Sequence, residues 1–339
     1  MTQFHTFSRW VTAAAITIMT VAAAGSDHVL VVDSSVPTPE VSQVIIMPVH
    51  CDSSGNVYLR PPLSKIGRDG RRTATFDLSA AGSDGLTGLM TKAFSVDPDG
   101  TVYELTRTKD DRVAVVRFDK DGHYLGSTLL DQQFEPQQLG VFQGDVYLVS
   151  GVTLPAAGSN PEFTPYLGLF DRAGRLIKQV GTGEPTYLPK TGSKTGPKTG
   201  NAGKGATEHL TAPPELGLME SDGTQVYLLR QGKTPTIFVI SNIGDIDRKL
   251  TLAPPSPDAQ ILALRVGVDQ FLVEYVRPNV PNGNAAYNLV LYSLQGDKLE
   301  EYTRGPGVSG TLGCTDWNGD FSFLTADDHG PVLLRATMR

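Results

Sequence analysis

One hairpin-like segment recurs along this chain of 339 residues, and it constrains the fold more than any other feature. Its clearest copy is AFSVDPDGTVYELTRT at residues 93–108. Alternating residues lead into Asp97-Pro98-Asp99-Gly100, and a β-branched and aromatic stretch begins again at Val102. Aspartate, proline and glycine favour a tight turn, and the flanking period of two favours strands. The segment is therefore predicted to be a β-hairpin.

Five weaker or stronger copies of this segment place an aromatic residue after a similar turn. The aromatic residues of all the copies are Tyr58, Tyr103, Tyr147, Tyr227, Phe271 and Phe321. They lie about 45 residues apart, except for one interval of about 80. A second type of hairpin alternates with the first, at residues 76–82, 118–122, 170–174, 240–244 and 292–296. Two hairpins in each period give four strands, which is the size of one propeller blade.

The repeat predicts an all-β fold, a six-bladed β-propeller of four-stranded antiparallel blades, in a single domain over residues 25–339. The last unit reaches residue 339 before a fourth strand, whereas residues 28–33 (HVLVVD) have no hairpin partner of their own. We expect this N-terminal strand to close the ring by pairing with the last blade, because the pairing hides an open sheet edge. The long interval contains an insert, residues 181–214, with three Lys-Thr-Gly copies. We expect this insert to be flexible, since its composition cannot bury a core.

Units such as CDSSGNVYL (residues 51–59) and SVDPDGTVYEL (residues 95–105) resemble the six-bladed β-propellers of the NHL-repeat and TolB-like superfamily. The resemblance covers nearly all of the chain after residue 24 and implies the propeller fold. It specifies a blade rather than an activity, because this architecture serves many functions.

The first 24 residues have the pattern of a secretory signal peptide. Arg9 precedes an apolar run at residues 11–21, and Ala22-Ala23-Ala24 forms a small-residue cleavage site. An uncleaved membrane anchor is the alternative, but residues 11–24 are shorter than the roughly 20 residues that a span needs. We therefore expect a secreted or periplasmic protein with no membrane span after cleavage.

Charge and motifs exclude several classes of function. The formal net charge is −7, which disfavours nucleic acid as a partner because phosphate binding needs a basic face. No GxSxG, HExxH or P-loop motif occurs. The Asp-x-Asp-Gly turns at residues 97–100 and 119–122 lack the remaining ligands of a calcium loop. The sequence therefore predicts no cofactor and no metal site.

The two cysteines, Cys51 and Cys314, are too far apart in sequence for a CxxC motif. They fall on the innermost strands of the first and last blades, which become neighbours when the ring closes. Counting from the turns places their side chains on opposite faces of their blades, as a contact between adjacent blades requires. Two interpretations stay open: a disulfide, which export would preserve, or two small buried hydrophobic residues.

The face of the propeller that carries the long connections is the candidate binding face, since long loops on a rigid scaffold often carry function. Arginines end four of the second strands toward this face: Arg60, Arg107, Arg230 and Arg277. They can form a cationic ring for an acidic glycan or a peptide carboxylate, or they are simply solvated side chains.

His50 and Asp52 lie on the innermost strand of the first blade, near the axis, and His209 and His329 lie in long loops. A histidine beside carboxylates near a channel can do acid–base chemistry or hold a metal. A lone histidine in a loop is more often only exposed. His50 and Asp52 are therefore candidate ligand-binding residues, without an assigned catalytic role.

Two functions follow as hypotheses. The first is an exported, non-catalytic binding or scaffold protein that presents its loop-rich face to a protein or glycan ligand. The alternative is a metal-assisted hydrolase or lyase of the propeller lactonase type. Four or more buried carboxylates and histidines that meet in the central channel would count against the first hypothesis.

Overall fold

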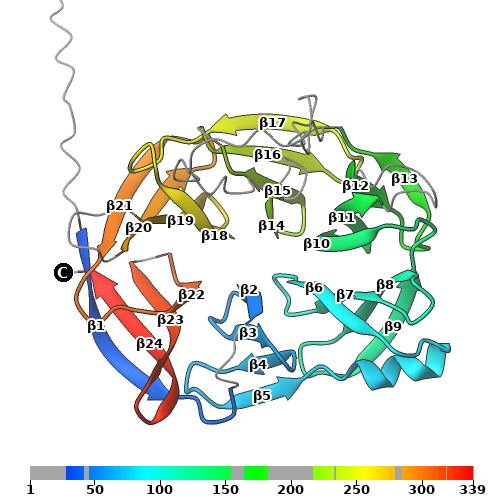
Figure 1. The fold of residues 1–339 in the computed structure, drawn as a ribbon, viewed down its shortest axis with the longest axis horizontal. Helices are drawn as coiled ribbons and strands as arrows, with labels where there is room; N and C mark the ends of the chain where they lie inside the picture. Colours follow the sequence, from blue (N-terminus) through cyan, green and yellow to red (C-terminus); the bar gives the residue numbers. More distant parts are fainter. Residues whose placement is uncertain are drawn as a thin grey trace, which may run out of the picture.

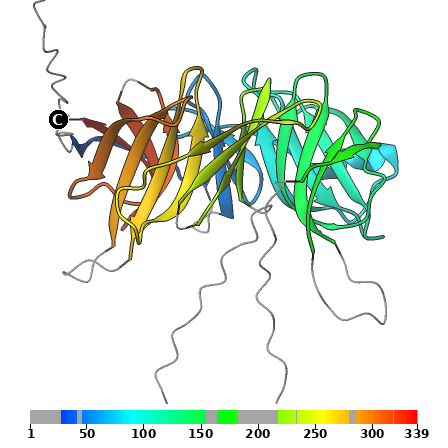
Figure 2. The same cartoon turned by 90° about the horizontal axis from the view of Figure 1, so that it is seen from above.

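The computed structural model of the chain describes residues 28–41, 46–153, 164–181, 217–232, 234–278, 285–317 and 319–338. Within these ranges the fold is all-β, with strands labelled β1 to β24 and one short 3-10 helix, η1 (Leu78–Asp84). The sheets surround a common axis in a propeller-like ring, with one strand of each unit nearest the axis (Figure 1). Seen from the side, the strands run between the two faces of the ring (Figure 2).

Four of the sheets have four strands each, joined in chain order by antiparallel pairing. The first sheet contains β2 (Ile46–Cys51), β3 (Val57–Arg60), β4 (Ser64–Ile66) and β5 (Arg72–Thr75). The second sheet contains β6 (Met90–Val96), β7 (Val102–Arg107), β8 (Val113–Phe118) and β9 (Tyr124–Leu129). The third sheet contains β10 (Glu135–Phe142), β11 (Val146–Thr153), β12 (Thr164–Phe170) and β13 (Leu176–Gln179). The fourth sheet contains β14 (Leu218–Ser221), β15 (Gln225–Arg230), β16 (Thr236–Ser241) and β17 (Ile246–Thr251).

The remaining sheet has eight strands, in the order β18-β19-β20-β21-β1-β24-β23-β22. Its β18 half contains β18 (Gln260–Val266), β19 (Gln270–Arg277), β20 (Ala286–Ser293) and β21 (Lys298–Arg304). Its β22 half contains β22 (Thr311–Thr315), β23 (Asp320–Asp327), β24 (Gly330–Met338) and β1 (His28–Pro37). The predicted pairing of the N-terminal strand with the last strands is therefore present, since β1 runs antiparallel to β24. A short parallel contact of β1 with β21 joins the two halves.

The turns of the first hairpin type form because aspartate side chains organise them. Asp52 accepts hydrogen bonds from the backbone N–H groups of Ser54 and Asn56, and Asp222 does the same for Thr224 and Gln225. Such side-chain bonds replace backbone bonds that a tight turn leaves unmade. In the second hairpin type, Gly174 has a φ of 79°, and a Cβ there would lie 1.9 Å from the Leu129 carbonyl oxygen. The chain needs glycine at this point because the turn packs directly against the neighbouring sheet.

The first sheet differs from the sequence prediction in its second hairpin. Residues 76–82 were expected to form it. Instead β4 and β5 lie within residues 64–75, around a turn closed by the Gly70 N–H and the Gly67 carbonyl oxygen. Residues 77–85 form η1 with its caps, where the Asp77 side chain accepts from the Ser79 N–H.

The strands nearest the axis are irregular. Register shifts interrupt the pairing of β2, β6, β10, β18 and β22 with their outer neighbours. A bulge turns the side chains that follow it and increases the local twist. The alternation expected around Cys314 therefore does not hold, because β22 shifts register between Leu312 and Thr315.

The hydrophobic core lies between adjacent sheets rather than at the axis. One cluster joins the second and third sheets through Tyr103, Leu105, Phe134 and Tyr147. Another joins the β22 half to the first sheet, with Val57 and Ile66 against Leu324. Burial of this kind is the main favourable contribution to folding and fixes each sheet against its two neighbours. The predicted signal peptide (residues 1–24) and all of the Lys-Thr-Gly insert after Gly181 lie outside the described residues.

Candidate functional site

Two side chains from opposite sides of the ring meet at its axis. His50 lies on β2 and Glu220 on β14, and Figure 1 places these strands across the centre from each other. His50 Nδ1 is 3.2 Å from Glu220 Oε2. The imidazole is 4% exposed and packs edge-on against Phe94, with ring centroids 4.7 Å apart. Its Nε2 is buried and has no hydrogen-bond partner among the described residues.

Arg265, on β18, completes this axial cluster. Its Nη1 is 3.1 Å from Glu220 Oε1, so one carboxylate joins the imidazole and the guanidinium. The other N–H groups donate to main-chain carbonyl oxygens: Nε to Gly313 at 3.0 Å and Nη2 to Leu312 at 2.9 Å. A buried guanidinium is stable only when it is paired and hydrogen-bonded in this way. The axial cluster His50–Glu220–Arg265 therefore ties the first sheet, the fourth sheet and both halves of the eight-stranded sheet.

The two cysteines lie next to this cluster. Both are free thiols in the structure, Cys51 half-buried and Cys314 buried, and both pack in the hydrophobic cluster between the first sheet and the β22 half. The hydrogen bond from Cys314 lowers the pKa of the Cys51 thiol, and the positive charge of Arg265 adds to this effect against burial. Burial raises the pKa of Cys314. The cysteines are thus neighbours, as the closed ring predicted, and the disulfide itself stays a prediction.

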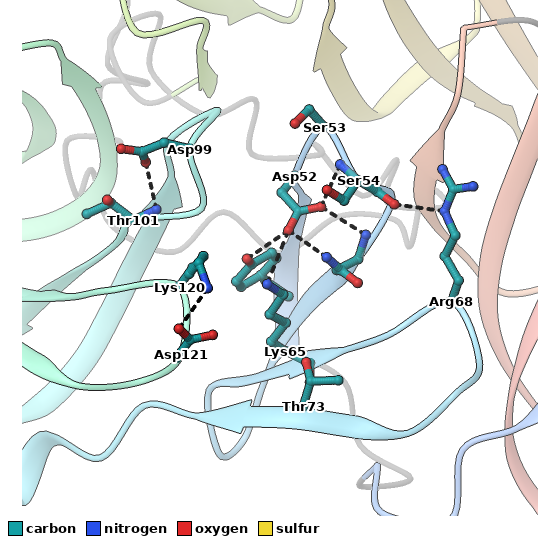
Figure 3. Close-up of polar contacts among 12 residues, drawn as sticks. Asp52, Ser53, Ser54, Lys65, Arg68, Thr73, Asp99, Thr101, Lys120 and Asp121 are labelled. Carbon is teal, nitrogen blue, oxygen red and sulfur yellow. Dashed lines mark hydrogen bonds and ion pairs between the residues drawn. The ribbon is translucent and has the colours of Figure 1, made fainter.

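Asp52 does not point to the axial cluster but organises the β2–β3 turn (Figure 3). It accepts hydrogen bonds from Asn56 and, at 3.0 Å, from the Tyr58 hydroxyl, and Lys65 Nζ lies 3.5 Å away. Burial disfavours the carboxylate, but the hydrogen bonds of Asn56 and Tyr58 and the charge of Lys65 outweigh it and lower the pKa of Asp52. The arrangement recurs, since Tyr103 donates to Asp97 and Tyr227 to Asp222. Asp52 therefore belongs to the repeat rather than to a site of its own.

Two of the four strand-end arginines join neighbouring sheets. Arg60 Nη1 donates to the Thr91 carbonyl oxygen at 3.2 Å, which joins the first and second sheets. Arg107 forms ion pairs with Glu135 of the third sheet and, at 3.1 Å, with Asp111. Each of these two side chains thus ties one sheet to the next.

Arg230 and Arg277 end β15 and β19. Both are half-buried, and the Nε of Arg277 is buried without a hydrogen-bond partner among the described residues. Arg230 lies an odd number of positions after the aromatic residue of its repeat, and Arg277 lies an even number of positions after the aromatic residue of its own. Side chains alternate between the two faces of a strand, so this count does not give the two arginines the same orientation. Ligand binding by the four arginines stays a prediction.

Three buried carboxylates lie away from the axial cluster. Burial raises the pKa of Glu104 to about 7, although Thr91 donates to it. Burial, together with the charge of Asp99, raises the pKa of Asp97 to about 7. Glu274 is paired with Arg304, whose guanidinium lies over the rings of Tyr287 and Phe323. These groups lie between strands, where they have a structural role, and they do not form one site.

A small cavity of about 120 Å³ opens between the first sheet and the β22 half. Its wall includes Cys314 and Thr315, two arginines, Arg68 and Arg335, and three aspartates, Asp33, Asp316 and Asp320. Arg68 Nε donates to the Ser54 carbonyl oxygen at 2.8 Å, and Arg335 donates to the Arg68 carbonyl oxygen. The cavity therefore reaches Cys314, whereas Cys51 is not part of its wall.

The described residues contain no group of three or more histidine, cysteine, aspartate or glutamate side chains arranged to hold a metal ion. His329 is exposed in the β23–β24 turn, and His209 lies outside the described residues. Among the helices that the structure describes, none is long and apolar enough to cross a membrane.

Sequence reasoning found His50 and both cysteines but missed Glu220 and Arg265. In the sequence, Glu220 and Arg265 look like ordinary solvent-facing polar residues of short strands. Only the closure of the ring brings their side chains together. The one available signal was an arginine between apolar residues in ALRVG at residues 263–267, where a charged side chain must find a buried partner.

Comparison with known proteins does not assign a family. No family model matches the chain, and no curated protein matches it. Among solved structures, a protein of unknown function from Bacteroides caccae aligns with 75% of this chain and 80% of its own length, at 12% identity and a TM-score of 0.44. Prolyl oligopeptidase B from Galerina marginata aligns at 13% identity and a TM-score of 0.42, over 85% of this chain and 48% of its own length.

Proposed function

We propose that this protein is an exported, non-catalytic propeller that binds an acidic ligand, foremost a carboxylate-bearing glycan, on the face with the inter-sheet connections. The observation that carries the proposal is the axial cluster. Glu220 is bonded to both His50 and Arg265, and Arg265 also donates to main-chain carbonyl oxygens. Polar groups paired in this way hold sheets together, and we place ligand binding on the faces of the ring.

The proposal includes six blades, with the eight-stranded sheet counted as two. Each half of that sheet has its own antiparallel meander, and the halves meet only in the short parallel contact of β1 with β21. Among the described residues, the hydrophobic clusters fall between six successive pairs of units, including one between the two halves. A closed ring has as many interfaces between blades as it has blades, so six clusters support six blades. We therefore keep the relationship to the NHL-repeat and TolB-like propellers as part of the proposal.

The two faces of the ring differ in the way that a binding protein requires. One face is formed by short turns that aspartates and glycines close, as at Asp52, Asp97 and Asp222. The other carries the connections between sheets and includes η1. Arg230 and Arg277 end their strands on this second face. A guanidinium binds a carboxylate through two parallel N–H groups, so these arginines suit an acidic ligand.

Retention on immobilised polygalacturonate tests the proposal. The full chain is expected to bind and to elute with salt, because contacts between charges are screened. The double substitution Arg230→Gln with Arg277→Gln is expected to weaken binding roughly tenfold or more, at about 1.4 kcal/mol or more of binding energy. The matched control is Arg172→Gln with Arg175→Gln, which removes two exposed charges from the opposite face.

Equal loss of binding in both double variants would mean that only net charge matters, and it would overturn the assignment of the face. A chain that is not retained at low salt would overturn the acidic ligand. Unfolding curves of all variants show whether each fold is intact, so a loss of binding is read only from folded protein.

A further inference from the structure

The cavity between the first sheet and the β22 half is not used by the proposed function, and it lies toward the opposite face of the ring. Its wall includes residues of three short turns: Gly55 between β2 and β3, Arg68 between β4 and β5, and Asp316 between β22 and β23. The connections between sheets, where we place the acidic ligand, follow the other ends of these strands. The cavity is therefore a candidate site for a second, separate ligand.

The strand register brings polar side chains of the β22 half to this wall. Arg335 on β24 lies directly opposite Ser322 on β23, and Thr337 lies opposite Asp320. Residues that lie opposite each other, or two apart along a strand, point to the same face of a sheet. These four side chains therefore lie on the face of the β22 half that meets the first sheet, and all four line the cavity.

Asp33 reaches the same wall from β1 at a β-bulge. The pairing of β1 with β24 shifts register between Val32 and Ser34, so Asp33 has no residue opposite it. A bulge turns a side chain out of the regular alternation of its strand. In this way Asp33 lines the cavity together with Asp320 and Arg335.

Backbone contacts hold both arginines of the wall in place. Arg68 Nε donates to the Ser54 carbonyl oxygen at 2.8 Å (Figure 3). The Arg68 guanidinium also lies against Gly55, where a Cβ would be 2.6 Å from Nε. Arg335 Nη2 donates to the Arg68 carbonyl oxygen at 2.8 Å. A guanidinium has five N–H donors, so these contacts leave donors of both side chains for a ligand.

Charges of both signs line the cavity without neutralising one another. Among the described residues, no ion pair joins Arg68 or Arg335 to Asp33 or Asp320. Burial raises the pKa of Asp320, and the negative charges of Asp316 and Asp33 add to this effect, which Arg335 only partly opposes. The wall has three carboxylates and two guanidiniums, so one negative charge is left over.

A ligand that matches this wall has a carboxylate for the arginines and more than one ammonium group for the aspartates. A guanidinium holds a carboxylate through two parallel N–H groups, and an ammonium group has three N–H donors for carboxylate oxygens. We propose that the cavity binds a small diamino carboxylic acid of the lysine class, with its carboxylate on the two arginines and its ammonium groups on the three aspartates. Such a ligand has one positive charge in excess at neutral pH, which neutralises the wall.

Equilibrium dialysis of the full folded chain with radiolabelled L-lysine tests the proposal. We expect saturable binding, and we expect norleucine and cadaverine to compete about tenfold less well or worse, because each lacks one charged contact. Norleucine lacks the side-chain amine, and cadaverine lacks the carboxylate. Competition by norleucine as strong as by lysine would overturn the part assigned to the aspartates, and equal competition by cadaverine would overturn the part assigned to the arginines. A lack of saturable binding in the millimolar range would overturn the whole proposal.

Two arginines of one turn provide a matched pair of variants. Arg68→Gln is expected to weaken the binding of lysine about tenfold or more and not to weaken that of cadaverine, which has no carboxylate to lose a partner. Arg71 is exposed in the same turn and is not part of the wall, so Arg71→Gln is expected to change neither. Equal losses in the two variants would mean that only the charge of the turn matters, and they would contradict the assigned site.

A second pair of variants tests the aspartates. Asp320→Asn is expected to weaken the binding of both lysine and cadaverine, because both ligands have ammonium groups. Asp269 is exposed in the β18–β19 turn and lies outside the wall, so Asp269→Asn is expected to leave both unchanged. Unbound variants with unchanged melting temperatures show that the fold is intact. Unchanged binding in Asp320→Asn would refute the role of this carboxylate.

The melting temperature gives a second readout, because a ligand that binds only the folded chain stabilises it. Lysine is expected to raise the melting temperature of the unsubstituted chain and of Arg71→Gln more than that of Arg68→Gln. Equal shifts in all three would mean that lysine acts on the chain without using this cavity. Retention on polygalacturonate is measured without lysine and concerns the other face, so the two proposals fail separately.

Discussion

Glu220 Oε2 on β14 lies 3.2 Å from His50 Nδ1 on β2, so the fourth and first sheets touch across the axis of the ring. The same carboxylate pairs with Arg265 through its other oxygen. One glutamate therefore holds strands from three units, and its loss affects the closed ring rather than one hairpin.

Glu220→Ala is expected to lower the free energy of unfolding by about 3 kcal/mol, because it leaves the buried Arg265 charge without its carboxylate. Urea unfolding followed by tryptophan fluorescence measures the change. The exposed Asp258→Ala is the control and is expected to change stability by less than about 0.5 kcal/mol. A similar, small effect of both substitutions would contradict a structural role for the axial cluster.

The tyrosines of the repeat provide a second, internally controlled prediction. Tyr58 and Tyr227 donate to turn aspartates, at 3.0 Å and 3.1 Å. The third sheet has no aspartate at the start of its turn, and the buried Tyr147 hydroxyl lies near Thr128 without a hydrogen bond of ordinary geometry. Tyr58→Phe and Tyr227→Phe should each lower the free energy of unfolding by about 1 to 2 kcal/mol, whereas Tyr147→Phe should leave it unchanged. Equal costs at all three positions, measured by thermal unfolding, would refute this account of the turns.

The pKa of Asp97 predicts a pH dependence. The folded chain holds the Asp97 proton up to a pH of about 7, whereas the unfolded chain loses it near pH 4. Between these values the folded state binds more protons, so the contribution of this group to stability falls as the pH rises. The free energy of unfolding of Asp97→Asn should therefore exceed that of the unsubstituted chain by about 1 to 2 kcal/mol at pH 8, and this difference should disappear near pH 4.

Unfolding in urea at a series of pH values measures this difference. Asp258→Asn is the control, because Asp258 is exposed and lies outside this turn. A stability difference between Asp97→Asn and the unsubstituted chain that does not change from pH 4 to pH 8 would contradict the raised pKa.

The N-terminal strand gives the fourth prediction. Leu30 is fully buried and belongs to the cluster with Tyr302 and Leu334, whereas Val32 on the same strand is 38% exposed. Leu30→Ala should cost about 3 kcal/mol through lost burial and the cavity that remains, and Val32→Ala much less. If both substitutions shifted the melting temperature equally, β1 would not be sealing the sheet.

The hairpins were predictable from the sequence because their signals are local. Aspartate and glycine turns followed by an aromatic residue identify β2–β3, β6–β7 and β14–β15 without any knowledge of the ring. The pairing of β1 with β24 was predictable because one unit lacked a strand and one strand lacked a partner.

Other features could not be predicted, each for a physical reason. The hairpin of β4 and β5 was missed because β4 has only three residues after two prolines, too few to show a period of two. Glu220 and Arg265 were missed because their partners lie in other units, where no spacing in the sequence points to them. The bulge at Cys314 depends on the Ser322 hydroxyl, which accepts from the Cys314 N–H at 2.9 Å, and such tertiary contacts override strand alternation.

The pairing of β1 with β21 and β24 also sets an order of events in time. During synthesis β1 emerges before every other described strand, while its antiparallel partner β24 is made about 300 residues later. The four-stranded sheets can form while the chain grows, because each pairs only with itself. The pairing of β1 with β24 must wait until β24 is made and must bring distant segments together, so its rate depends on the search of a long chain. A chain released before β24 therefore holds β1 without its antiparallel partner, and quality control by chaperones or proteases has that whole interval in which to act.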